Sequence, residues 1–408
     1  MVQERIFKKL FKCWNQMLPI LILLFIFLFI CTGNCFAENT PEKSHTADSG
    51  AIMEEQLDYY DFSDINAFVQ KAEQETGITE RLDIKTFIRE LIKGDGKGRL
   101  KQLGHLTFRL LAGEVVDNVG LLMKLVILSV LCAILQNINS SFQQEEVSHF
   151  AYYICYMAIM VMLVNCFHSA MNIGYDVIDQ MTSFMNALLP NVFIALLSVT
   201  NNTGYALMQP VLFALITGVS NAMDKLVLPL IYVTAVLSII NHISDKIQIS
   251  KLRDFTKQVA FGVIGIVTTL FIGIVSIQKI FITTFNGVAA QTAKFALGSF
   301  VPVIGDFLSN AYDLVVSCSM MIKSGIGIFG LFVLILIAVL PLIKLLTLFF
   351  VFKLTAALIQ PMMDNQVASS LSDLSGSLFM LFIAVLCVIL MFFIGITVLM
   401  TTGGLIAR

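Results

Sequence analysis

Residues 325–354 read GIGIFGLFVLILIAVLPLIKLLTLFFVFKL, thirty positions in which Lys344 and Lys353 are the only charged side chains. About 20 apolar residues are enough for a helix to cross the hydrocarbon core of a bilayer. This stretch is longer than that. It therefore predicts a protein whose α-helices span a membrane.

The same apolar character extends over most of the chain. Residues 119–408 hold 12 Lys or Arg and 11 Asp or Glu in 290 positions, and the whole chain is 57% hydrophobic and 13% charged. Soluble domains have about 25% charged residues, so a large soluble enzyme is excluded. The net charge of −2 leaves no basic surplus for nucleic acid. We expect an all-α, polytopic membrane domain over residues 119–408, with about seven to nine spans.

The N-terminus predicts a secretory signal peptide over residues 1–37. Basic residues from Arg5 to Lys12 precede an apolar run from Leu18 to Cys31, and small residues suit cleavage after Ala37. The alternative is an uncleaved first membrane helix. Under either interpretation, residues 38–118 lie outside the cytoplasm.

The exported segment, residues 38–118, is acidic and contains no cysteine. Ser63 can cap a helix with apolar positions at Ile65 and Val69, and the apolar spacing over 84–92 predicts a second helix. About 60 ordered residues make a marginal core. We therefore expect these helices to dock on the membrane domain, on lipid headgroups or on another protein.

The placement of charge predicts the orientation of the spans. Loop 242–258 carries four Lys or Arg against two Asp, which predicts a cytoplasmic loop, whereas loop 364–376 has two Asp and no basic residue, which predicts an outside loop. Nine crossings from an exported N-terminus satisfy both. The nine predicted spans are 119–138, 150–167, 183–199, 205–223, 226–241, 259–280, 317–337, 338–360 and 377–400.

An internal repeat is indicated by matches at nearly constant offset. The pentapeptide VLPLI occurs at 227–231 and at 339–343, 112 residues apart, and Pro190 and Pro302 are also 112 apart. QMTSF at 180–184 is answered by QTAKF, 111 residues later. We predict duplicated halves at about 172–280 and 284–400. Because the equivalent loops are predicted on opposite faces, the repeat is expected to be inverted, as in many alternating-access transporters. Treating both proline segments alike breaks this charge parity, so whether they cross stays open.

Few residues of the membrane domain could carry chemistry. Ionisable side chains at membrane depth suggest function, and a proline inside a span exposes backbone groups that can bind ions. The alternatives are lysines that reach the interface, aspartates on a surface-lying helix, and prolines that only kink. The candidate transport-path or hinge residues are Lys124, Asp176, Asp179, Pro190, Pro302, Asp306, Asp313 and Lys353.

Glycine pairs predict close helix packing rather than a site. They are Gly325 and Gly327 with Gly330, and Gly262 with Gly265. The chain has no nucleophile elbow, no phosphate-binding loop and no metal-ligand spacing. We expect no enzymatic activity, no cofactor and no metal site.

Three runs carry a resemblance to a known family: CFHSAMNI at 166–173, MTSFMNALLP at 181–190 and TAKFALGSFVP at 292–302. They resemble the stage III sporulation protein AE family of endospore-forming Firmicutes, as does the order of signal peptide, acidic exported segment and hydrophobic domain. The resemblance implies a protein of the mother-cell membrane around the forespore. It also implies partners, namely the other proteins of the stage III sporulation A operon, including its ATPase and ring-forming subunits, and SpoIIQ in the forespore. The assembly is needed for forespore development and late sigma G activity.

Three functions remain open at this point. The chain could be the transport or export core of the mother cell–forespore channel complex. It could be a scaffold in the membrane that docks the ATPase and the ring proteins without passing cargo. A minor alternative is a secondary transporter that acts alone.

Overall fold

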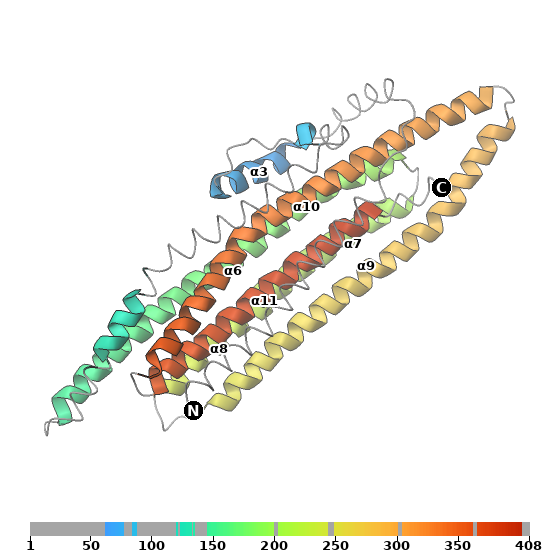
Figure 1. The fold of residues 1–408 in the computed structure, drawn as a ribbon. Helices are drawn as coiled ribbons and strands as arrows, with labels where there is room; N and C mark the ends of the chain where they lie inside the picture. The colour runs from blue at the N-terminus through green and yellow to red at the C-terminus, as the bar shows by residue number, and fades with distance from the viewer. Residues whose placement is uncertain are drawn as a thin grey trace. The chain divides into compact units, whose positions relative to one another are not determined.

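The computed structural model describes residues 62–76, 84–87, 120, 123–132, 134, 145–199, 203–243, 249–300, 304–361 and 365–401, and all its elements there are helical (Figure 1). The chain divides into two units, 1–51 and 52–408, and every described residue belongs to the second. The prediction of an all-α protein is confirmed.

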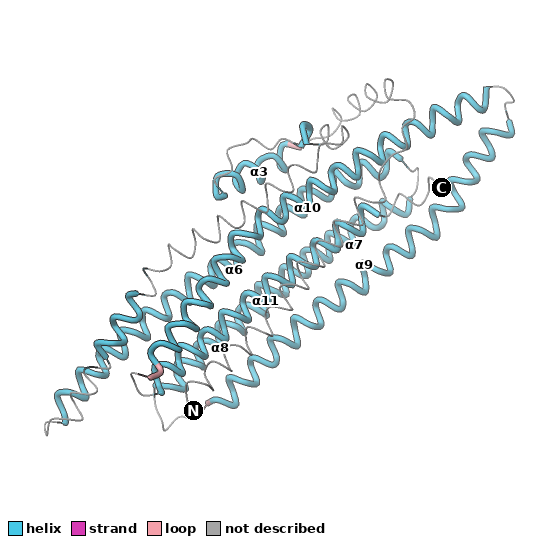
Figure 2. Tube along the Cα trace, in the orientation of Figure 1, coloured by secondary structure: helices cyan, strands magenta, loops and turns pink. Residues whose placement is uncertain are grey.

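The helices are unusually long, and Figure 2 shows that they run as nearly uninterrupted tubes. A mean helix in globular proteins has about 11–12 residues. Here α6, α9 and α10 have 55, 51 and 56 residues. The elements are α3 (Ser63–Thr76), α6 (Glu145–Val199), α7 (Thr203–Ala222), the π-helical turn η1 (Met223–Val227), α8 (Leu228–Ile243), α9 (Ser250–Phe300), α10 (Ile304–Ile359) and α11 (Asn365–Thr401).

Five helices within the described residues are long and apolar enough to cross a membrane. Several predicted spans are halves of one helix, so those divisions are wrong: 150–167 and 183–199 both lie in α6, and 317–337 and 338–360 both lie in α10. Likewise 205–223 and 226–241 belong to the continuous rod α7–η1–α8. The segment 119–138 contains a shorter apolar helix, Met123–Cys132.

The core of the bundle is formed by α10 and α11, which pack on each other more extensively than any other pair, and by α6. In α10 and α11, 67% and 72% of the most apolar 18-residue stretch is buried, whereas in α9 the buried share of that stretch is 22%. A helix that is apolar all round and buried is a central helix. The helix α9 therefore lies at the periphery of the described bundle, on α8 and α11.

Contacts between helices fix their directions. Between α10 and α11, Lys353 meets Ser372 and Gly327 meets Met400, so the two run antiparallel. Contacts of α11 with α6 and α9 advance in the same sense on both partners, so these three helices run parallel. The pairs are Tyr156 with Ser370, Gly174 with Leu381, Arg253 with Asp373, and Phe271 with Gly395.

The predicted opposite placement of loops 242–258 and 364–376 is wrong. Arg253 at the start of α9 forms an ion pair with Asp373 near the start of α11. Both loops therefore lie at the same end of the bundle, separated along the chain by one passage out through α9 and one back through α10. The duplication stays a prediction, but its halves would run in the same direction rather than inverted. The two Asp residues of loop 364–376 were a poor guide to its side of the membrane, because Asp and Glu contribute little to the orientation of membrane helices.

Pro229 produces a π-helical turn instead of a broken helix. A proline ring clashes with the carbonyl four residues earlier and removes one backbone donor. Here the chain widens into η1 just before Pro229, and the N–H of Leu228 donates to the carbonyl of Met223, five residues back. Pro341, at the matching position of the second VLPLI, lies inside the continuous helix α10.

Helix α3 confirms the prediction of a helix beginning at Ser63. Its apolar positions Ile65 and Val69 are fully buried. They are covered because α3 packs on α6 and α10. Residues 84–87 are also helical, and the rest of the second predicted helix lies outside the described residues.

Close packing is confirmed at one glycine pair and wrong at the other. A Cβ atom at Gly330 would lie 2.6 Å from Leu188 Cδ2, and one at Gly327 would collide with Met400. Gly262 and Gly265 instead face open space on α9. The first pair lies between central helices, and the second on a helix with an exposed side.

Candidate functional site

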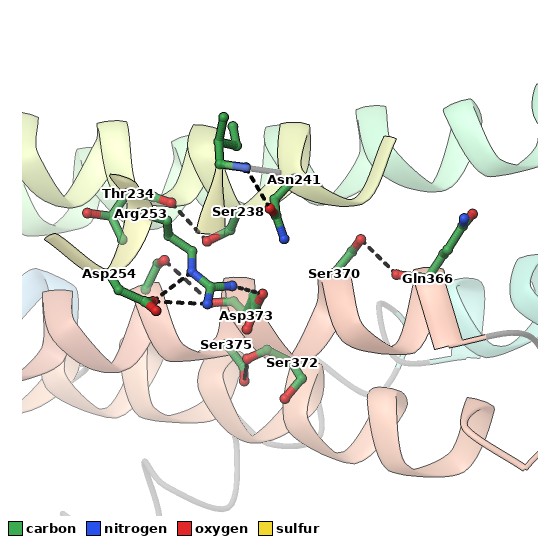
Figure 3. A network of polar contacts seen from close by, with 12 residues as sticks. Thr234, Ser238, Asn241, Arg253, Asp254, Gln366, Ser370, Ser372, Asp373 and Ser375 are labelled. Carbon is green, nitrogen blue, oxygen red and sulfur yellow. Dashed lines mark hydrogen bonds and ion pairs between the residues drawn. The ribbon is translucent and has the colours of Figure 1, made fainter. Parts of the chain in front are cut away.

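A polar cluster joins the helix ends beside the two loops, and we call it the loop-end cluster (Figure 3). The guanidinium of Arg253 donates to Asp373 on α11 and, at 2.9–3.1 Å, to Asp254 on its own helix. The phenol of Tyr156 on α6 lies beside Ser370 on α11. Nearby, the backbone N–H of Ile249 donates to Asn241 Oδ1 at 3.2 Å, which fixes the return from α8 to α9.

Lys353, a candidate from the sequence, belongs to this cluster. Its Nζ donates to Ser372 Oγ at 3.1 Å, and the side chain is half-buried between α10 and α11. A lysine near a helix end that reaches a polar partner fits the structural alternative. The loop-end cluster therefore pins four helices together.

A second polar site surrounds the π-helical turn. Asp224 on η1 accepts a hydrogen bond from Ser220 Oγ at 3.4 Å, and its Oδ1 has no partner among the described residues. The carboxylate of Asp179, another sequence candidate, lies on α6 close enough to repel that of Asp224. Single π-helical turns are frequent at functional sites. The structure thus adds Asp224 to the predicted Asp179, while Asp176 lies exposed one turn away.

Lys323 on α10 is the residue that the sequence reasoning missed. Its side chain is only 2% exposed, and no described residue forms a hydrogen bond or ion pair with it. An unpaired lysine in an apolar interior is costly. Its signal in the sequence is a lysine within the apolar run of the predicted span 317–337.

The other candidates are not brought together. Lys124 is exposed on the short helix Met123–Cys132. Pro190 lies inside α6 and does not end it. Pro302 lies outside the described residues. Asp306 and Asp313 belong to α10, but their side chains are not among those the structure describes.

The described residues offer two positions for buried or part-buried charge, at Lys323 and Asp224. They contain no group of three His, Cys, Asp or Glu side chains that could hold a metal ion. Cys132, Cys155, Cys166, Cys318 and Cys387 are free thiols. The arrangement can bind ions or polar groups at Asp224 and Lys323.

The comparison with known proteins connects this architecture to a family. The family model for stage III sporulation protein AE matches residues 82–403. The chain belongs to the stage III sporulation protein AE family. The stage III sporulation protein AE of Bacillus subtilis (strain 168) is 36% identical over 321 residues, which cover 79% of this chain and 80% of that protein. No solved structure matches significantly.

The family match covers every described helix from α6 to α11 and leaves α3 outside. The resemblance noted at 166–173 and 181–190 falls on α6, which carries Asp176 and Asp179 between the two runs. Membership of the stage III sporulation protein AE family, together with the long apolar helices, makes this a sporulation-related membrane protein.

Proposed function

We propose that this chain is the transport or export core of the complex that joins the mother cell to the forespore. In this proposal it lies in the mother-cell membrane around the forespore, and forespore development and late sigma G activity depend on it. The other proteins of the stage III sporulation A operon and SpoIIQ are its partners, directly or indirectly. Because the sequence contains no nucleotide-binding motif, energy for transport comes from the operon's ATPase.

The observation that carries the proposal is the burial of Lys323. The side chain is 2% exposed on α10, with no described ion-pair partner. Removing an ion from water costs several kcal/mol unless the surroundings compensate. A bundle that only holds partners together gains nothing from this cost. A path for polar or anionic groups needs such a position.

Asp224 supports the same proposal from a second helix. It lies on a π-helical turn with one carboxylate oxygen unpartnered among the described residues. Single π-helical turns are frequent at functional sites. Asp224 and Lys323 offer charges of opposite sign on different helices of the bundle.

The scaffold remains the second candidate, and a specific observation favours it. Most of the apolar stretches of α10 and α11 are buried inside the bundle, and the loop-end cluster holds the helix ends together. A rigid block of this kind suits docking of the ATPase and ring proteins. The autonomous transporter requires that the chain act without its operon partners, so deletion of those partners tests it.

Substitution of Lys323 by Met separates a functional lysine from a structural one. Methionine has a similar length and removes the cost of burying an amine. We therefore expect the free energy of unfolding to rise by about 1–3 kcal/mol. We expect heat-resistant spores and a sigma G reporter to fall at least tenfold, with normal amounts of protein in the membrane. Lys344→Met is the matched control, because it removes a half-buried lysine of the same helix that lies outside the loop-end cluster.

Full sporulation of Lys323→Met and Asp224→Asn, with normal protein levels, would reject the transport path and leave the scaffold. A loss of protein level in Lys323→Met would give Lys323 a structural role. A fluorescent fusion that fails to collect at the membrane around the forespore would reject the proposed location.

A further inference from the structure

The long helices are too long to be covered by lipid along their whole length. The apolar stretches of α6 (Ile154–Ala195) and α10 (Cys318–Ile359) have 42 residues each. At 1.5 Å per residue each measures about 63 Å, twice the roughly 30 Å of a hydrocarbon core. Membrane helices tilt by about 0–40°, which cannot absorb a factor of two. Part of each helix must therefore lie outside the hydrocarbon.

The exposed side of α6 shows where this change occurs. From Ile154 to Val164 its exposed side chains are apolar, and Val161 is 57% exposed. From 165 to 193 every exposed side chain is polar. These residues, which we call the α6 polar stripe, continue the same face at helical spacing: Asn165, His168, Ser169, Asn172, Asp176 and Asp179.

Lipid cannot cover the α6 polar stripe at low cost. It contains two carboxylates, and a charged side chain in the hydrocarbon core is costly. The neighbouring rod α7–η1–α8 shows the same change. Its exposed side chains from Leu226 to Ile240 are apolar, and the next residue away from the loop-end cluster, Lys225, is exposed. Phe167 packs on Tyr232, so the changes at Asn165 and Lys225 lie within about 15 Å along the bundle.

The position of α3 gives an independent argument. Phe68 on α3 packs edge-on against Phe184 of α6, five residues beyond the polar stripe, at a centroid distance of 6.0 Å. Gln70 and Lys71 on the other side of α3 are exposed. A helix with one apolar side on the bundle and a charged side outward has water around it.

Residues 84–87 repeat this arrangement on α10. Phe87 packs on Phe329 and Phe332 at 5.2 and 5.7 Å, while Thr86 is exposed. The surface of the bundle around Phe329 on α10 therefore also faces water. The remaining length of α10, from 333 to 359, is about 40 Å and suffices for one crossing.

We infer that, on the side of α6 and α10, lipid acyl chains cover only the half of the bundle that ends in the loop-end cluster. On this side the other half, comprising α6 beyond about His168 and α10 around Phe329, stands in the aqueous phase with α3 bound to it. On α9 the exposed side chains include Asp254 and Lys257 near the loop-end cluster, and they are uncharged and mainly apolar from Phe261 to Ile277, about 25 Å. Because Phe271 meets Gly395, this run lies farther from the loop-end cluster than the apolar part of α6, so the bundle is tilted in the bilayer.

Single cysteines on one face of α6 test the inference. Val161→Cys and Asn172→Cys, each in a Cys-free variant, lie three turns apart, and both native side chains are exposed on the protein. In opened membranes, a membrane-impermeant maleimide reaches both bilayer faces. We expect it to label position 172 at least ten times faster than position 161, and both equally after unfolding in SDS. Nitroxides at the two positions should collide with a water-soluble nickel complex at 172 and with oxygen at 161.

Equal protection of positions 172 and 161 would overturn the inference, because lipid or protein would then cover both. Equal labelling would overturn it as well, since the apolar belt would be open to water. A high yield of a disulfide-linked dimer through position 161 would assign the belt to a second copy of the chain. If the Cys-free variant does not accumulate, hydroxyl-radical footprinting of the wild-type protein in membranes must show the same difference between Val161 and Asn172.

Discussion

At the scale of single residues, the ion pair between Arg253 and Asp373 determines how α9 meets α11. The two side chains are 19% and 31% exposed, and they are 120 residues apart in the chain. Half-buried pairs are screened less than surface pairs, although each contributes only modestly. The pair therefore specifies which ends meet more than it stabilises the fold.

Reversal of these charges gives a double-mutant test. We expect Arg253→Asp or Asp373→Arg alone to lower the free energy of unfolding by about 1 kcal/mol, because each places like charges together. The double reversal should recover most of this loss, as measured by thermal unfolding in detergent. Additive losses in the double variant would show that the two residues do not interact.

Glycine packing gives a second test at this scale. Gly330→Val places two methyl groups against buried Leu188, and overpacking of this kind costs about 1–3 kcal/mol. Gly262→Val is the matched control, because its added carbons meet nothing within 4 Å. The thermal midpoint in detergent should fall for the first and stay nearly constant for the second. A similar fall in both would mean that the backbone preference of glycine dominates.

Residue types predicted some of this site and could not predict the rest. Asp179 and Lys353 stood out because charge is rare in an apolar domain, and both make polar contacts. Which residue they contact depends on helices far apart in the sequence, and hydropathy carries no information on partners. Lys323 was visible as a charge but not as a buried one, since burial on all sides comes from packing.

At the scale of elements, the sequence predicted helices well and their lengths poorly. The periodicity of Ile65 and Val69 placed α3 correctly, because an amphipathic helix shows its period directly. In the membrane domain, the prediction of spans of about 20 residues divided each of the single helices α6 and α10 in two. Pro190 and Pro341 lie inside these helices, and tertiary packing keeps both helices continuous.

The docking of α3 rests on a small apolar contact and can be removed. Ile65 is fully buried, and Ile65→Ala is expected to weaken docking by about 2–4 kcal/mol. We expect hydrogen exchange in 63–76 to rise at least tenfold while exchange in α11 is unchanged. Ala67→Ser, on the exposed side, is the control. Unchanged exchange in Ile65→Ala would show that other contacts hold the helix.

At the scale of the whole molecule, the parallel placement of α6, α9 and α11 gives a topology that labelling can test. Ser250→Cys and Gln366→Cys lie at the starts of α9 and α11. We expect impermeant maleimide to reach neither from outside intact cells and both in inside-out vesicles, since the basic loop 242–258 predicts a cytoplasmic end. A cysteine at Thr401 lies one crossing away and should label from outside. Labelling of 250 and 366 from opposite sides would restore the inverted arrangement.

The length of α10 also has a consequence for how the protein is made. The machinery that inserts membrane proteins responds to roughly 20 apolar residues at a time, and α10 presents two such lengths in succession around Pro341. A nascent chain can therefore enter the bilayer there as two short helices joined at the proline. It reaches the finished single helix only after α11 has been synthesised and supplies the antiparallel partner on which α10 packs. We expect biogenesis to include a rearrangement of threading after translation, so that a chain truncated before α11 stays trapped with a different number of crossings.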